Sequence, residues 1–175
     1  MFALKFVGVI ILVISSALYG FSLGDAYLTR IRNLKELHKN MILLDGELMY
    51  NKTPLRMAMK KMALRTDSLY SDFFNYIANA MEDDYSLEVT DAWEEAVNAI
   101  IHEKYCFQEK DIVKLKEFGK SIGNRDDNTR KASFENYFLE LSIDIEEAVK
   151  EKDNKVTIYR TMGIMAGMFI SIIIV

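Results

Sequence analysis

Proline, cysteine and histidine are almost missing from this chain of 175 residues. Pro54 is the only proline, and together with 50% hydrophobic residues this favours helices over a loop-rich or disordered chain. Cys106 is the only cysteine, so a disulfide bond within the chain is excluded and a cysteine-based metal site is not expected. His38 and His102 lie too far apart in sequence to suggest a ligand cluster. We therefore expect no metal ion or other cofactor.

Two uncharged runs lie at the ends of the chain. Residues 6–24 contain 19 uncharged residues and residues 161–175 contain 15. At ~1.5 Å per residue the first run crosses a hydrocarbon core of about 30 Å, whereas the second reaches roughly 22 Å. We predict transmembrane helices in residues 1–24 and 161–175, with a single helical domain in residues 25–160. The alternatives are a cleaved signal peptide for the first run and a buried core helix for the second.

The charges beside these runs predict an orientation. The domain side carries eight basic residues close to the two runs, and the opposite side carries only Lys5. The positive-inside rule then places the domain in the cytoplasm. A lone cysteine is typical of such a reducing compartment. The eight residues are Arg30, Arg32, Lys35, Lys39, Lys150, Lys152, Lys155 and Arg160.

Apolar residues between the ends recur at helical spacing, which predicts a bundle of five or six helices and no strand. The first helix covers about residues 25–50, and Thr53 as N-cap with Pro54 at the first helical position begins the second. Thr66 and Thr90 are expected to cap the next two helices. Helices from about Gln108 to Ile122 and from about Asp127 onward complete the set. Gly123 is expected just past the end of one helix. Glycine in mid-helix is unfavourable, so Gly119 predicts a close crossing of two helices at that point. Trp93 lies on the apolar face of its helix and is expected in the hydrophobic core.

No arrangement of residues points to catalysis. The sequence has no glycine-rich phosphate loop, no G-x-S-x-G and no H-E-x-x-H. Asp45 and Glu47 are two residues apart and point away from each other on a helix, so hydrogen bonding between helices is favoured over an acid–base pair. Asp126 and Asp127 are better explained by a helix N-cap than by a calcium loop.

Charged surfaces are therefore the candidate binding features. A basic face on residues 52–65 and an acidic cluster in residues 82–95 suit protein docking, although each is also typical of a solvated face. The basic face could also bind anionic lipid if it lies within ~8 Å of a bilayer. Nucleic acid is not expected, because the net charge is −4. The candidates are Arg56, Lys60, Lys61 and Arg65 on the basic face, and Glu82, Asp83, Asp84 and Glu94 in the acidic cluster.

The whole chain resembles the stage III sporulation protein AB family of endospore-forming bacteria. The resemblance lies in the two terminal runs and in the segments ELHKNMILLDGELMYNKTPL (36–55), SLEVTDAWEEAV (86–97) and LKEFGKSIGNRD (115–126). One departure is Arg130, near the place where the family often has glutamine. The residues to which the resemblance assigns structural roles are Glu47, Tyr50, Thr53, Pro54 and Trp93, with Gly119 and Gly123 added from their helix positions.

The resemblance implies a fold and a role. The fold is all-α: a six-helix bundle similar to the F-domain of type II secretion platform proteins, between two transmembrane helices. The role is a non-catalytic platform in the channel that joins mother cell and forespore, located in the mother-cell membrane. Expected partners are a cytoplasmic secretion-type ATPase, other membrane subunits of the channel, the lipid bilayer and, as a possibility, further copies of the chain. The alternative is a small membrane-anchored regulator or chaperone that is unrelated to an ATPase.

Overall fold

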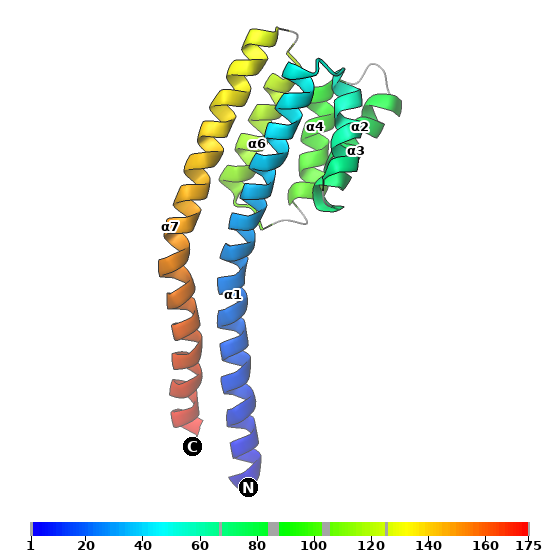
Figure 1. The fold of residues 1–175 in the computed structure, drawn as a ribbon. Helices are drawn as coiled ribbons and strands as arrows, with labels where there is room; N and C mark the ends of the chain where they lie inside the picture. Colours follow the sequence, from blue (N-terminus) through cyan, green and yellow to red (C-terminus); the bar gives the residue numbers. More distant parts are fainter. Residues whose placement is uncertain (1, 67, 84–87, 103–105, 125, 175) are drawn as a thin grey trace. The chain divides into compact units, whose positions relative to one another are not determined.

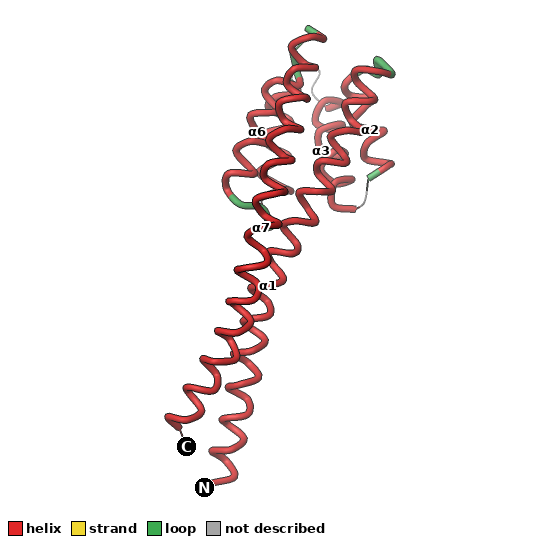
Figure 2. The backbone as a smooth tube through the Cα atoms, turned by 60° about the vertical axis from the view of Figure 1, so that its left-hand side comes forward, coloured by secondary structure: helices red, strands yellow, loops and turns green. Residues whose placement is uncertain are grey.

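The computed structural model describes residues 2–66, 68–83, 88–102, 106–124 and 126–174, and within these ranges every element is a helix (Figure 2). The prediction of an all-α fold is confirmed. Two five-residue π-helical segments, η1 and η2, directly follow α1 and α4, and the sequence reasoning did not expect them. The elements are α1 (Phe2–Asp45), η1 (Gly46–Tyr50), α2 (Leu55–Arg65), α3 (Ser68–Asp83), α4 (Val89–Ala96), η2 (Val97–Ile101), α6 (Glu109–Ile122) and α7 (Asp127–Ile174).

The chain divides into two compact units. One unit combines residues 1–31 with residues 146–175, where the ammonium of Lys155 lies 5.4 Å from the centre of the Tyr27 ring. The other unit is formed by residues 32–145 and contains most of the core.

The terminal runs fall mainly on residues whose side chains the structure does not describe. Among the residues that it does describe, no helix combines the length and the apolar character needed to cross a membrane. The two transmembrane helices, and the domain limits 1–24, 25–160 and 161–175 drawn from them, stay predictions.

Helices of the 32–145 unit contact one another in sequence order (Figure 1). Helix α2 packs on α3, α3 on α4, and α4 on α6. Phe118 of α6 stacks on Tyr137 of α7 with the ring centres 4.5 Å apart. The hydroxyl of Tyr70 on α3 donates a hydrogen bond to the carbonyl oxygen of Asn33 on α1, at 2.7 Å. These contacts bring α1, α3 and α7, which are far apart in sequence, into one bundle.

The predicted apolar stripes form the core of this bundle. The buried members are Leu34, Met41 and Leu44 on α1, Leu48 on η1, and Ala58, Met59 and Met62 on α2. Burial of such stripes removes apolar surface from water, which is the main favourable term in folding. Leu37, Tyr70, Phe74 and Phe118 are also buried in this core.

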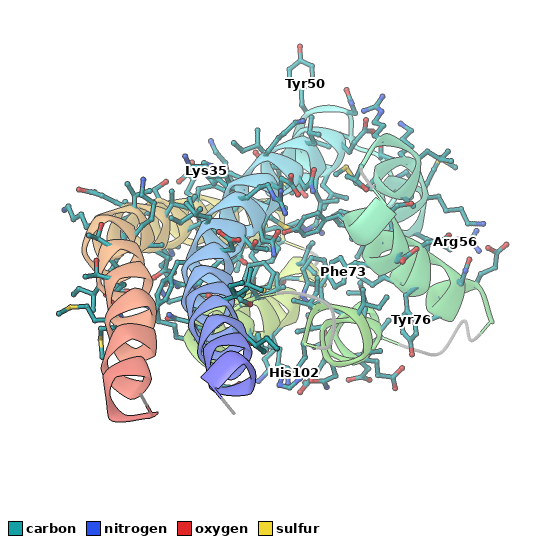
Figure 3. All side chains as sticks on the ribbon, turned by 90° about the horizontal axis from the view of Figure 1, so that it is seen from below. Lys35, Tyr50, Arg56, Phe73, Tyr76 and His102 are labelled. Carbon is teal, nitrogen blue, oxygen red and sulfur yellow. The ribbon has the colours of Figure 1, made fainter. Side chains whose placement is uncertain are left out.

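Trp93 lies at the centre of the aromatic core. Its side chain is fully buried, and its indole N–H donates to the carbonyl oxygen of Leu115 at 2.9 Å. Its ring meets Phe73 edge-on at 5.0 Å between centres, an arrangement that the aromatic quadrupoles favour. Phe73 is drawn in the bundle interior in Figure 3.

The close helix crossing predicted at Gly119 is confirmed. A Cβ atom at this position would lie 2.1 Å from Cδ1 of Trp93. Gly123 directly follows Ile122, the last residue of α6, so its predicted place just past the helix end is confirmed. It is the C-cap of α6 and right-handed, with φ −71°. Its lack of a side chain instead leaves room for Val89, whose Cγ1 would lie 2.7 Å from an added Cβ.

Three predicted threonine N-caps are corrected by the structure. Pro54, not Thr53, is the N-cap of α2, because the helix begins at Leu55, and the Thr53 hydroxyl donates to Glu47. Thr66 donates its hydroxyl back to the carbonyl oxygen of Met62 at the end of α2. Thr90 lies inside α4, whose N-cap is Glu88.

Two other helix starts have side-chain caps. Gln108 and Asp111 form a reciprocal capping box at the start of α6. At the start of α7, Asp126 Oδ2 accepts hydrogen bonds from the Thr129 backbone N–H at 2.8 Å and from the Thr129 hydroxyl at 2.5 Å. The N-cap interpretation of this polar turn is confirmed.

Candidate interaction site

Glu47 is the centre of an ion-pair cluster that joins the end of α1 to α2. Its carboxylate is 2% exposed and lies in η1. Oε1 accepts a hydrogen bond from Nη1 of Arg65 at 2.6 Å, and Oε2 accepts from Nζ of Lys61 at 2.8 Å. The Thr53 hydroxyl donates to Oε2 at 2.9 Å. One buried carboxylate therefore binds two cations and a hydroxyl from a segment that begins six residues later.

The local backbone explains how Glu47 reaches these partners. The π-helical turn Gly46–Tyr50 ends α1, and the backbone N–H of Asn51 donates to the carbonyl oxygen of Gly46 at 3.0 Å. The Thr53 N–H donates to the carbonyl oxygen of Glu47 at 2.9 Å. Two hydrogen bonds, one from the backbone and one from the side chain of Thr53, thus fix the turn against Glu47.

The cluster changes the acidity of its carboxyl group. The hydrogen bond from Lys61, followed by that from Thr53, lowers the pKa of Glu47 from 4.5 to about 2. Hydrogen bonds to the charged form stabilise it, so Glu47 is ionised throughout the physiological range. The interpretation that this carboxylate serves hydrogen bonding between elements is confirmed.

Asp45 lies in a different environment from Glu47. Burial raises the pKa of Asp45, and the nearby charge of Glu135 adds to this, while Lys131 opposes it. Glu135 and Lys131 belong to α7, whereas the partners of Glu47 belong to α2 and the turn before it. The two carboxyl groups thus face different elements.

The basic face predicted on α2 already has partners inside the chain. Lys61 and Arg65 bind Glu47, and Lys60 forms an ion pair with Glu82 on α3. Lys60 and Glu82 are about half exposed, and the pKa of Glu82 is lowered by its hydrogen bond to Lys60. Arg56 is half-buried and also interacts with its surroundings. The basic and acidic candidates are therefore partly neighbours rather than separate patches.

Of the other acidic candidates, the structure describes the side chain of Glu94 only. Glu94 on α4 lies 3.7 Å from the ammonium of Lys116 on α6. The side chain of Asp83, and all of Asp84, lie outside the described residues. No continuous acidic surface can be drawn from the members that are placed.

Tyr50, expected to have a structural role, is 90% exposed and projects away from the bundle (Figure 3). The turn that carries it is otherwise tied down. Lys52 has a left-handed backbone, with φ 51°, and its ammonium binds Asp127 of α7 at 2.6 Å. Tyr50 is therefore a surface residue at the tip of a restrained turn.

A second polar cluster, which the sequence reasoning missed, lies between α6 and α7. Lys114 binds Asp144 at 2.6 Å beside a cavity of about 180 Å³ whose lining includes Tyr137 and Glu140. Burial lowers the pKa of Lys114, but the hydrogen bond and charge of Asp144, with Glu140 and Asp111, outweigh it and raise the pKa. Burial, followed by the same acidic residues, raises the pKa of Tyr137 well above its usual value.

This cluster has a structural function in the bundle. Asp144 and Tyr137 are 3% and 4% exposed, and the Tyr137 hydroxyl has no hydrogen-bond partner. Lys114 and Asp144 join the two helices that the aromatic stack of Phe118 on Tyr137 also joins. The sequence shows Lys114 three residues after Asp111 on α6, and Asp144 on α7. That Lys114 approaches Asp144 depends on how α6 and α7 pack, which the sequence pattern does not show.

Among the described residues, no group of three or more histidine, cysteine, aspartate or glutamate side chains is arranged to hold a metal ion. The fold and the site define a helical-bundle protein whose charged residues tie helices together and cover one exposed face of α2.

The comparisons with known proteins identify the family. The family model described as stage III sporulation protein AB matches residues 5–175, and the chain belongs to this family. The stage III sporulation protein AB of Bacillus subtilis (strain 168) is 22% identical over 171 residues, which cover 98% of this chain and 99% of that protein. The resemblance recognised in the sequence is confirmed.

A solved structure shares the fold. It is a stage III sporulation protein AB, and it aligns with a TM-score of 0.66 at 21% identity. The alignment covers 72% of this chain and 98% of the solved chain. The helical arrangement is therefore one already seen in a protein of this name.

Proposed function

We propose that this protein is a non-catalytic platform in the channel between mother cell and forespore, where it couples a cytoplasmic ATPase to the membrane complex. The observation that carries the proposal is the family match over residues 5–175, which makes the chain a sporulation protein along its whole matched length.

The proposal includes a place in the cell. The helical bundle lies in the cytoplasm of the mother cell, and the apolar runs 6–24 and 161–175 anchor it in the membrane around the forespore. The supporting observations are the uncharged composition of both runs and the basic residues on the domain side of them. Other membrane subunits of the channel contact the anchors.

Charged residues on α2 are the proposed contact with the ATPase. The side chains of Lys60, Lys61 and Arg65 remain 46%, 42% and 56% exposed despite their internal ion pairs. Exposed ion pairs contribute little to stability, so the Lys60–Glu82 pair can be exchanged for a carboxylate of a partner at low cost. Lys61 and Arg65 are less suitable for a test, because they also hold Glu47.

The test is co-purification of the full chain with the sporulation ATPase at low and at high salt. We expect retention that weakens as salt rises, because exposed charges are screened. Lys60→Glu is expected to reduce retention, whereas Lys120→Glu on exposed α6 surface is the matched control and leaves it unchanged. No retention of the ATPase by the unaltered chain at either salt contradicts the coupling role. Equal retention of the ATPase by the unaltered chain, Lys60→Glu and Lys120→Glu shows that the basic face is only solvated surface.

A further inference from the structure

Helix α2 has two apolar side chains on the side that faces away from the core. Met57 is 55% exposed and Leu64 is 89% exposed, although the residues between them include the fully buried Ala58, Met59 and Met62. Met57 and Leu64 are seven residues apart, so they lie on one face of the helix about 10 Å apart along its axis. The structure thus leaves an apolar pair uncovered on a helix whose other side is already packed.

Cations border this apolar pair on both sides. Lys60 and Lys61 occupy the positions three and four residues after Met57, in the same outward stripe. Arg56 and Arg65 flank the stripe, and Arg56 projects from the outer side of the bundle in Figure 3. The outward face of α2 is therefore an apolar centre with a basic border.

A groove beside this face continues onto α3. It has a volume of about 320 Å³ and is lined by Lys60, Ala63 and Leu64 from α2, and by Ser71, Asn75 and Asn79 from α3. Asn75 and Asn79 are exposed, and their amides can both donate and accept hydrogen bonds. The hydroxyl of Ser71 donates to the carbonyl oxygen of Ala63 at 2.7 Å, which joins the two walls of the groove.

We infer that the outer face of α2 and the α2–α3 groove bind an acidic amphipathic helix of a partner protein. The inference rests on the proposed docking function and names the kind of segment that docks. An apolar stripe in the partner covers Met57 and Leu64, and carboxylates beside that stripe meet Lys60, Lys61 and the two arginines. Leu64 is the anchor of the partner helix, because it is more exposed than Met57 and also lines the groove.

A protein segment fits this face better than a membrane surface does. Helices that lie in a membrane interface use a broad apolar face, and the broad apolar face of α2 is buried in the bundle. Two side chains form a stripe only one residue wide, and the groove next to it is walled by asparagine amides, which suit polar groups of a peptide.

The test places a photo-crosslinking amino acid at position 64 of the full chain in sporulating cells, and a second chain carries it at position 139. Leu139 on α7 is 63% exposed and serves as the matched control. We expect a crosslink from position 64 to an acidic amphipathic helix, identified by mass spectrometry of the joined peptides, and none to that helix from position 139. Crosslinks from position 64 only to lipid, to a basic or neutral segment, or to nothing overturn the inference.

Binding measurements separate this inference from the proposed function. Leu64→Glu is expected to weaken binding of the purified ATPase by about tenfold or more, the effect of losing one anchor, while Leu139→Glu leaves it unchanged. ATPase binding that withstands Leu64→Glu, together with no crosslink from position 64 to an acidic helix, overturns the inference and leaves the coupling role standing. A crosslink to an acidic helix of another protein, with no ATPase binding by the unaltered chain, supports the inference and overturns the ATPase coupling.

Discussion

Trp93 of α4 is a side chain through which three helices of the bundle, α3, α4 and α6, contact one another. It contacts Phe73 of α3, Phe118 and Gly119 of α6, and donates its N–H to the Leu115 carbonyl. An indole at the centre of a core contributes both a large apolar area and a satisfied hydrogen bond. The periodicity of the sequence placed Trp93 in the core, but it did not show which backbone group accepts its N–H.

Replacing Trp93 by alanine is expected to destabilise the protein by ~3–5 kcal/mol, because the surrounding helices cannot fully close the cavity. Chemical denaturation measures the change in unfolding free energy. Tyr50→Ala is the control, since Tyr50 is 90% exposed and its loss should change stability by less than ~0.5 kcal/mol. A loss below ~1 kcal/mol for Trp93→Ala contradicts the core position.

Glu47 illustrates a residue whose role depends on distant partners. Its type and its place near the end of the first helix are visible in the sequence, but helical spacing alone predicts that Lys61 and Arg65 belong to a solvated basic face. The structure turns both of them back toward Glu47. Which cation reaches a carboxylate depends on how α1 and α2 meet, and helical periodicity carries no information about that.

Glu47→Gln is expected to lower stability at pH 7 and to have progressively less effect in acid. The folded-state pKa of about 2 lies below the usual 4.5, so the ionised carboxylate stabilises the fold above pH 4.5. This contribution is lost as pH falls from 4.5 toward 2. Urea denaturation of both chains across this range measures the difference, with the exposed Glu117→Gln as control. A difference that stays constant from pH 7 to pH 2 contradicts the ion-pair account.

Glycines control how closely two elements approach. Gly119 lies against the Trp93 ring, whereas Gly46 has no atom within 4 Å of the place where a Cβ would be. Both lie in helical segments, where glycine is less favourable than alanine by ~1 kcal/mol. The same substitution therefore has opposite expected effects at the two positions.

Gly119→Ala is expected to destabilise by ~1–3 kcal/mol, because the fully buried Trp93 ring has no free space into which to move. Gly46→Ala is expected to stabilise by ~0.5–1 kcal/mol through the helix preference of alanine. Thermal or chemical denaturation of the two variants gives the comparison. Stabilisation by Gly119→Ala would show that α4 and α6 can separate without cost.

Helix limits were predicted more accurately than helix caps. The predicted starts near residues 108 and 127 agree with α6 and α7, where Gln108 and Asp126 are capping side chains. The threonine caps were wrong because α2 begins one residue later and α4 two residues earlier than predicted, so that their N-caps are Pro54 and Glu88. The π-helical segments were missed, since the same residues also match an α-helical period.

At the scale of the whole molecule, Cys106 reports the proposed orientation. It is the only cysteine in the chain and is exposed. With the bundle in the cytoplasm, a membrane-impermeant maleimide should leave Cys106 unlabelled in intact cells and label it after permeabilisation. Labelling of intact cells contradicts the orientation. Cys106→Ser is the control for non-specific reaction of the reagent with the chain.

The sequence by itself determined the helical class, the buried stripes and the family resemblance, because these depend on residue type and on spacing within one helix. Tertiary structure decided the partners of Glu47, the contact of Trp93 with Gly119 and the cluster between α6 and α7. It also showed that Met57 and Leu64 stay uncovered while the opposite side of α2 is packed. These features arise where different helices pack against one another. Ion pairs, close crossings and burial at such places depend on the packing geometry of both helices, which the spacing of residues within one helix does not specify.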